Sequence, residues 1–215
     1  PMYVKDYMVT NVITVTSDTL VTDAQDLMKK HDVRRLPVVD NGRLTGLVTM
    51  PDIKEAAPSS ATSLSIWELH YLLAKLKVGE IMTKASKLIT VPPDTTIENA
   101  ARLARQHKIG SLLVVESKDH LLGLLTDTDI FDILIDILGP YENTVRLHFY
   151  ESFKGKPLGE ITNVINKHRM IIHSMFVVTS PGSKRKDLIV RLGTTDAGPV
   201  IKDFRDRGYT VEQSP

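Results

Sequence analysis

The chain has 215 residues, enough for one or two domains, or three if each is small, and 42% of them are hydrophobic, which excludes wholesale disorder. Lys and Arg number 27 against 26 Asp and Glu, and the net charge of +1 comes without the clustered basic excess of a dedicated nucleic-acid binder. The absence of cysteine excludes disulfides, cysteine nucleophiles, iron–sulfur clusters and zinc knuckles.

Residues 4–56 are predicted to form a β-α-β-β-α unit. Asp18 and Thr19 supply N-cap chemistry just before a helical spacing of apolar residues. The predicted elements are a strand at Ile13–Val15, a helix carrying Ala24, Leu27 and Met28, strands at Leu36–Val39 and Leu44–Thr49, and a helix that opens at Pro51 and Asp52.

An insert follows at residues 57–77. It begins with the loop residues Pro58 to Ser60 and continues with an apolar stripe at helical spacing, at Ile66, Leu69, Leu72, Leu73 and Leu76. Two interpretations stay open for this helix: packing within the surrounding domain, or a dimer contact.

Residues 78–138 repeat the first unit, with two small insertions in polar stretches. The matching elements are a strand at Ile89–Val91, cap residues Asp94 and Thr95, a helix carrying Ala100, Leu103 and Ala104, strands at Leu112–Val115 and Leu121–Thr126, and a helix from Thr128 and Asp129. One such unit is marginal alone, so we expect the copies to pack as a pseudo-twofold pair with two equivalent clefts.

The spacing of apolar residues is different over residues 144–215 and predicts the order βαββαβ of the ferredoxin-like motif. Its predicted elements are strand Thr144–Tyr150, helix Pro157–His168, strands Met170–Thr179 and Asp187–Thr194, helix Ala197–Gly208 and strand Tyr209–Glu212, after a linker at Gly139–Asn143.

Both copies end in a strand that leads into Thr-x-x-Asp, at Thr49 and Asp52 and at Thr126 and Asp129. One interpretation is plain helix capping. The other is a nucleotide site, because a carboxylate accepts hydrogen bonds from a ribose diol and helix N-termini favour phosphate.

The two copies resemble a tandem pair of CBS domains, a Bateman module. The resemblance rests on three motifs that are largely present twice: the Asp-Thr before the first helix, the segment from His31 to Val39 with its Leu-Pro-Val-Val, and the closing Gly-Leu-Val-Thr-x-x-Asp. The resemblance implies an α/β (α+β) fold and binding of adenine nucleotides or S-adenosylmethionine. It implies that Asp52 and Asp129 hold ribose hydroxyls, that Thr49 and Thr126 touch ribose or phosphate, and that apolar residues flank the adenine at Ile13, Leu36, Ile89 and Leu112.

By the same resemblance Arg34 and Arg35 would meet phosphate, with solvated surface as the alternative. The second copy has Gly110 and Ser111 at these positions, and Leu113 replaces Pro37. We therefore expect the two clefts to differ in phosphate affinity, with Ser111 as the nucleotide-binding residue at the second.

The C-terminal segment resembles an ACT domain, a regulatory fold that pairs side by side and binds amino acids. Its loop at Ser152–Leu158 lacks the usual Asp-x-Pro-Gly order, so structural packing is the alternative to amino-acid binding. The whole chain, with Trp67 in the insert, is similar to the AcuB-like acetoin utilisation family, which implies regulation of acetoin or related carbon catabolism. The CBS and ACT resemblances imply a homodimer.

No P-loop, Gly-x-Gly-x-x-Gly, Gly-x-Ser-x-Gly or His-Glu-x-x-His pattern occurs, so we predict no enzyme, catalytic residue or catalytic cofactor. Asp127, Asp129 and Asp132 could hold a cation beside a phosphate, but we expect capping and solvation, hence no metal site. The sequence has neither an 18-residue apolar run nor the apolar start of a signal peptide, so we expect a cytoplasmic protein that binds neither membrane nor nucleic acid. The functional alternatives are a nucleotide-sensing regulator, an amino-acid sensor acting through the C-terminal domain, and an assembly scaffold with vestigial clefts.

Overall fold

A computed structural model describes residues 2–56, 75–138, 142–150, 158–179, 182 and 184–214. The chain forms two compact units, Pro1–Asp132 and Ile133–Pro215, and the boundary falls within one helix. The amphipathic stripe predicted in the insert, apart from Leu76, and nearly all of the predicted loop at Ser152–Leu158 lie outside the described residues.

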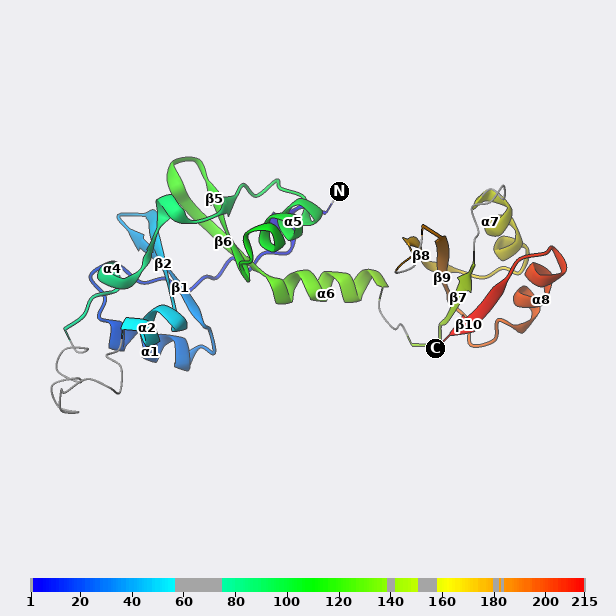
Figure 1. Ribbon diagram of the computed structural model, residues 1–215, viewed down its shortest axis with the longest axis horizontal. Helices are drawn as coiled ribbons and strands as arrows, with labels where there is room; N and C mark the ends of the chain where they lie inside the picture. The colour runs from blue at the N-terminus through cyan, green and yellow to red at the C-terminus, as the bar shows by residue number, and fades with distance from the viewer. Residues whose placement is uncertain are drawn as a thin grey trace. The chain divides into compact units, whose positions relative to one another are not determined.

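The first unit contains two three-stranded sheets, in the orders β1-β2-β3 and β4-β5-β6 (Figure 1). The first copy supplies η1 (Val4–Asp6), α1 (Val21–Lys30), β1 (Arg35–Asp40), β2 (Arg43–Thr49) and α2 (Met50–Ala56). The second supplies α4 (Val78–Ile81), β3 (Thr83–Lys84), η2 (Ala85–Lys87), β4 (Thr90–Val91), α5 (Ile97–His107), β5 (Ser111–Glu116), η3 (Ser117–Asp119), β6 (His120–Thr126) and α6 (Asp127–Leu138).

The two copies share even their irregularities. The antiparallel hairpins β1-β2 and β5-β6 each shift register at the same place, between Val38 and Val39 and between Val114 and Val115. The predicted strand at Ile89–Val91 forms as β4, whereas its counterpart at Ile13–Val15 is reduced to one parallel bridge between Val15 and Val38. Duplicated sequence has therefore produced duplicated geometry.

The segment at the start of each copy, which begins at Val4 or Val78, is hydrogen-bonded to the other copy. The Val4 amide donates to Thr95 O at 2.8 Å, and the equivalent Val78 amide donates to Thr19 O at 2.8 Å. Strand β3, at the start of the second copy, pairs with β2 of the first, and Val9 forms a bridge to Leu124 on β6. The copies are thus joined by reciprocal backbone hydrogen bonds as well as by apolar contact.

Two glycines leave room for this exchange. A Cβ built at Gly46 would overlap with Met82 Sδ and lie 2.8 Å from Thr83 O. A Cβ at Gly123 would lie 2.6 Å from Met8 Sδ and 2.8 Å from Val9 O. Because the backbone of each exchanged segment crosses directly over a glycine, no larger residue fits without a shift.

The exchange also explains why the predicted N-caps are wrong. Helices α1 and α5 begin after Leu20 and Thr96, not after the Asp-Thr pairs. The first amide of α1, on Val21, donates to Leu76 O at 2.9 Å, and that of α5, on Ile97, donates to Met2 O at 3.1 Å. Backbone carbonyls from distant segments thus satisfy these first amides, and at α5 the Thr96 side chain adds a cap by accepting from Asn99 N at 3.4 Å.

The second unit follows the order β-α-β-β-α-β, with an antiparallel sheet in the strand order β10-β7-β9-β8. Both of its helices lie on one face of the sheet (Figure 1). The elements are β7 (Val145–Phe149), α7 (Leu158–Lys167), β8 (Ile172–Thr179), β9 (Lys186–Leu192), α8 (Gly198–Asp206) and β10 (Val211–Ser214).

The core of this unit lies between the sheet and its helices. Phe149, Phe204 and Tyr209 meet edge to face, with Phe149 and Phe204 centroids 4.8 Å apart. On α8, Asp203 lies within 3.1 Å of Lys167 and His168 at the end of α7 and 2.7 Å from Arg207. Hydrogen bonds from Arg207, Lys167 and His168 hold the pKa of Asp203 well below its usual range, so the carboxylate ties the two helices together.

We predict that Gly46→Ala lowers the free energy of unfolding of the first unit by about 1–3 kcal/mol, because the new methyl group would press on the backbone of β3. Scanning calorimetry of the full chain would measure the loss. Gly159→Ala on α7 is the matched control, since nothing lies within 4 Å of its added Cβ. Equal melting temperatures for the two variants would contradict the argument.

Candidate functional site

The two Thr-x-x-Asp phrases form capping boxes at the starts of α2 and α6. Asp52 Oδ2 accepts from Thr49 N at 2.7 Å and from Thr49 Oγ1 at 2.6 Å. Asp129 Oδ2 accepts from Thr126 N and Oγ1, both at 2.7 Å. The Asp52 and Asp129 amides donate back to the two threonine hydroxyls at 3.4 and 3.2 Å. The capping interpretation is therefore realised in both copies.

Capping uses only one oxygen of each carboxylate. Within the described part of the chain, no hydrogen bond reaches Oδ1 of Asp52 or of Asp129. Both side chains are partly exposed. Each carboxylate is thus held in a fixed orientation while one acceptor atom stays available, so capping and ligand binding are compatible at this position.

Sheet register brings the polar candidates of each copy together. Arg35 lies opposite Thr49, and Ser111 lies opposite Thr126. The guanidinium of Arg35 also reaches across to the second copy, where its Nη2 lies 3.3 Å from a Cβ built on Gly110. No ion pair or hydrogen bond to the Arg35 side chain occurs among the described residues. In this part of the chain, a cation without a partner therefore lies between the two copies.

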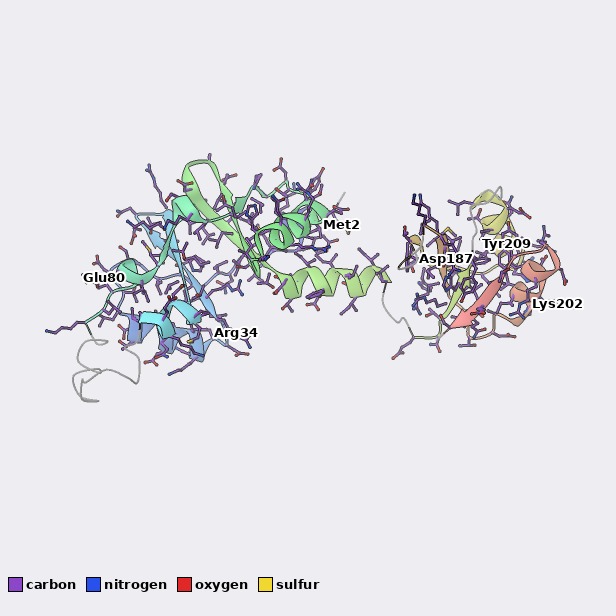
Figure 2. The ribbon with its side chains drawn as sticks, in the orientation of Figure 1. Met2, Arg34, Glu80, Asp187, Lys202 and Tyr209 are labelled. Carbon is purple, nitrogen blue, oxygen red and sulfur yellow. The ribbon has the colours of Figure 1, made fainter. Side chains whose placement is uncertain are left out.

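The apolar candidates divide into two groups. Leu36 and Leu112 are fully buried in the interior of the unit, so their side chains present no surface to a ligand. Ile13 and Ile89 are half-buried. Arg34 is exposed at the surface of the first copy, one residue before β1 (Figure 2).

Sequence reasoning named Gly110 only as the replacement of Arg34 and Asp127 only as a possible cation ligand, and did not predict that they lie together beside Arg35. A Cβ at Gly110 would lie 3.2 Å from Asp127 Oδ2 and against Arg35, so glycine keeps the space open for both groups. The available signal was the asymmetry of the repeat, because Gly110 and Asp127 stand where the first copy has Arg34 and Met50. Side chains of opposite charge approach here without forming an ion pair.

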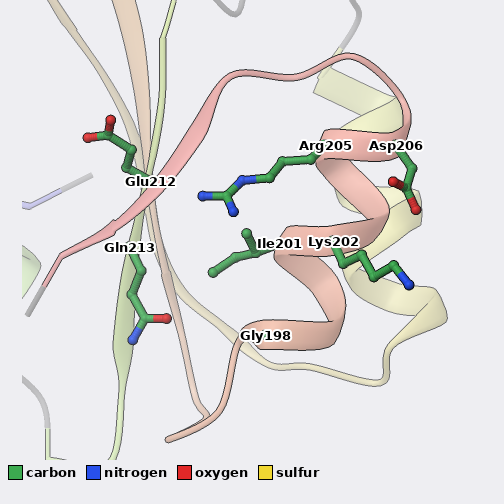
Figure 3. Close-up of a pocket in the computed structure, with 7 residues that line it drawn as sticks. All are labelled: Gly198, Ile201, Lys202, Arg205, Asp206, Glu212 and Gln213. Atoms are coloured by element: carbon green, nitrogen blue, oxygen red, sulfur yellow. The ribbon is translucent and has the colours of Figure 1, made fainter.

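Two cavities occur elsewhere in the described residues. The smaller, of about 170 Å³, lies between the N-terminal segment and the hairpin ends and is lined by Thr10, Val12, Thr14, Val39, Gly42, His120, Leu121 and Leu122. The larger, of about 630 Å³, is a groove between α8 and β10 (Figure 3). In the groove Arg205 points toward β10 and donates to Val211 O at 3.1 Å. Neither cavity includes a predicted site residue.

Over the described ranges, no group of three or more His, Cys, Asp or Glu side chains is placed to hold a metal ion. None of the helices in those ranges combines the length and apolar character needed to cross a membrane.

A model of the CBS domain family matches residues 4–59 and 78–136. The chain belongs to the CBS domain family. A CBS domain-containing protein of Dictyostelium discoideum is 32% identical over 138 residues, which are 64% of this chain and 94% of that protein. Inosine-5'-monophosphate dehydrogenase of Aquifex aeolicus is 34% identical over 124 residues, but these make up only 22% of the enzyme. The similarity to the enzyme is thus confined to a CBS segment.

Solved structures agree with the CBS assignment. CBSX2 of Arabidopsis thaliana, determined in complex with AMP, is 30% identical with a TM-score of 0.52, over 63% of this chain and 97% of that one. The CBS pair of protein MJ0100, with 5'-methylthioadenosine and S-adenosylmethionine, is 27% identical with a TM-score of 0.51, over 62% and 97%. A Vibrio cholerae protein assigned to acetoin utilisation (AcuB) is 31% identical with a TM-score of 0.52, over 62% and 90%.

We predict that Asp52→Ala and Asp129→Ala each lower the free energy of unfolding of the ligand-free CBS pair by about 1 kcal/mol, because each removes a capping carboxylate. Chemical denaturation would measure this. Asp132→Ala on the exposed face of α6 is the control, with an expected change of at most about 0.5 kcal/mol. If all three variants match the parent protein, the capping role is wrong.

Proposed function

We propose that the protein is a non-catalytic regulator that binds an adenine nucleotide or a related adenosyl ligand in the clefts of its CBS pair. The supporting observation is the duplicated Thr-x-x-Asp box, whose carboxylate keeps one oxygen available in each copy while the guanidinium of Arg35 lies between the copies. A diol acceptor beside a cation suits a ribose linked to phosphate. Relatives whose structures contain AMP, 5'-methylthioadenosine or S-adenosylmethionine support the same ligand class.

In this proposal each residue has a definite role. Asp52 and Asp129 accept hydrogen bonds from ribose hydroxyls through Oδ1. Arg35 meets phosphate, with exposed Arg34 as a second cation. Ile13 and Ile89 flank the adenine, and Thr49, Thr126 and Ser111 supply hydroxyl groups. The two clefts are unequal because Gly110 and Asp127 give the second copy less positive charge than the first.

Regulation requires that occupancy favours one arrangement of the copies over another. The exchanged segments offer a route for this, since β3 of the second copy is hydrogen-bonded to β2 of the first and β2 leads directly to Thr49. We infer that ligand binding at the end of β2 changes the packing of the pair. That change would pass to a partner enzyme or to the protein's own oligomer.

A homodimer is part of the proposal. Helix α6 leaves a run of large apolar side chains in solvent, among them Phe131 at 60% and Ile135 at 57% exposure. Apolar clusters of this kind mark association surfaces. A second copy offers a matching helix, and the self-complementary contact of a twofold dimer would cover both.

The C-terminal unit supports a second candidate function. Its β-α-β-β-α-β order and four-stranded antiparallel sheet suit a ferredoxin-like ACT-type domain, and hence an amino-acid sensor acting through this unit.

The likeness of the CBS pair to an AcuB protein supports a setting in acetoin or related carbon catabolism for either candidate. Stabilisation by an amino acid, and not by any adenine nucleotide, would favour this second candidate.

We predict that AMP, ADP, ATP or S-adenosylmethionine raises the melting temperature of the purified chain. Asp52→Asn should weaken the binding about tenfold, as expected for a lost hydrogen bond to a charged group. Isothermal calorimetry would measure the affinities, and native mass spectrometry would report the oligomer and any retained nucleotide. Asp18→Asn is the control, because Asp18 is an exposed carboxylate paired with Lys77. The proposal fails if none of the four ligands binds.

A separate prediction concerns phosphate. Arg35→Ala should weaken ATP binding by about tenfold or more while changing adenosine binding little, because only ATP carries the oxyanions that the guanidinium contacts. Calorimetry with both ligands measures the ratio. Arg43→Ala, at the opposite end of the same hairpin, is the control. Equal losses for ATP and adenosine would show that Arg35 acts on the fold and not on phosphate.

A further inference from the structure

The C-terminal sheet carries two arginines side by side on the face opposite to its helices. Arg146 on β7 and Arg191 on β9 are register partners, and the buried neighbours Leu147 and Leu192 point to the core on the other side. Residues directly opposite each other on antiparallel strands have Cβ atoms about 5 Å apart, and like charges in this position are destabilising. The pair therefore needs a compensating partner.

The described chain supplies no carboxylate to this pair. Arg191 is only 6% exposed, and its Nη1 donates a hydrogen bond to Thr144 Oγ1 at 3.1 Å. Arg146 makes no ion pair with any described residue, and its Nε is buried without a hydrogen-bond partner. Buried charges in proteins are normally paired, because an uncompensated one costs several kcal/mol.

The acids of the same sheet face are used elsewhere. Asp187 lies four residues before Arg191 on β9, roughly 13 Å away along the strand. Asp187 contacts Arg185 and His148, each at 3.1 Å. Glu212 accepts a hydrogen bond from Tyr150 at 2.7 Å. Charge on this face is thus separated over the described strands, with the carboxylates at one end and two unneutralised arginines at the other.

Serines extend the arginine pair on both sides. The register places Ser174 on β8 next to Arg191, and Ser214 on β10 next to Arg146. Ser174 Oγ is buried and has no hydrogen-bond partner in the described structure. The row across the sheet is therefore Ser, Arg, Arg, Ser, in which every side chain can donate and two positive charges need neutralising.

We propose that this row, Ser174, Arg191, Arg146 and Ser214, is a binding site for a doubly charged oxyanion, either a phosphate group or a dicarboxylate. Guanidinium groups donate bidentate hydrogen bonds to both kinds of group, and the serine hydroxyls complete the donor set. Two negative charges match the two arginines. The site stands independently of nucleotide binding by the CBS pair.

The test is titration of the full chain with inorganic phosphate and, separately, with succinate, against sodium chloride of equal ionic strength to remove general screening. We expect at least one of the two anions to bind and to raise the melting temperature of the parent protein. Arg146→Met and Arg191→Met should each weaken that binding by at least about tenfold, as expected for lost charged hydrogen bonds. Which anion binds more tightly identifies the ligand class.

A control variant and a control background locate the anion on this row. Arg185→Met removes an arginine of the same sheet face that already has a carboxylate partner, so it should leave anion binding unchanged. Every titration is also made on chains carrying Arg35→Ala, because the nucleotide proposal assigns that arginine to phosphate, and the outcomes are read in that background. AMP binding to the parent chain tests the nucleotide proposal separately.

Three results would overturn the proposal. One is no response of the parent protein to either anion beyond that of chloride. Another is a response that survives in the variant carrying both methionine substitutions. The last is that Arg146→Met changes the oligomer mass, measured by analytical ultracentrifugation, but does not change anion binding. That result would place a second copy of the chain against the arginines. If Arg191→Met is less stable than the parent protein without anion, the test still holds, because anion binding is measured separately on Arg146→Met.

Discussion

The CBS pair depends on the reciprocal exchange of its leading segments. Val4 and Val78 are completely buried, and each donates a backbone hydrogen bond to the other copy. Gly46 and Gly123 allow the exchanged backbones to cross the hairpins at close range. Strand β3 of the second copy completes the sheet of the first, and Val9 of the first copy bridges to β6 of the second, so each copy holds backbone of the other.

The same residues cap helices and form the candidate clefts. Thr49 and Asp52 fix the start of α2 through three reciprocal hydrogen bonds, and Thr126 and Asp129 do so for α6. A carboxylate held by one oxygen is already oriented before a ligand arrives, which lowers the entropic cost of binding. Helix capping and the proposed ligand binding are therefore compatible at this position. The two boxes differ in the charge around them, because Arg35 lies against Gly110 and near Asp127.

Charge has a different role in the C-terminal unit. Asp203 contacts Arg207, Lys167 and His168 and so joins the two helices on one side of the sheet. On the other side, Asp187 and Glu212 are satisfied by neighbouring side chains, whereas Arg146 and Arg191 lie together without an acid from the described strands. A net charge of +1 for the whole chain thus hides a strongly uneven local distribution. Binding sites for small anions need such local imbalance and not a basic surface.

The sequence by itself determined the repeat, the order of the elements and the Thr-x-x-Asp boxes, because hydrophobic periodicity and capping act over a few residues. The strands containing Leu36 and Leu112 and the alternation of Val145, Leu147 and Phe149 follow from it directly. Only the tertiary structure decided where the helices α1 and α5 begin, since Leu76 O and Met2 O from distant segments satisfy their first amides. It also decided that Arg35 faces Gly110 and that Arg146 meets Arg191. Each of these depends on contacts between residues far apart in the chain, which no local pattern encodes.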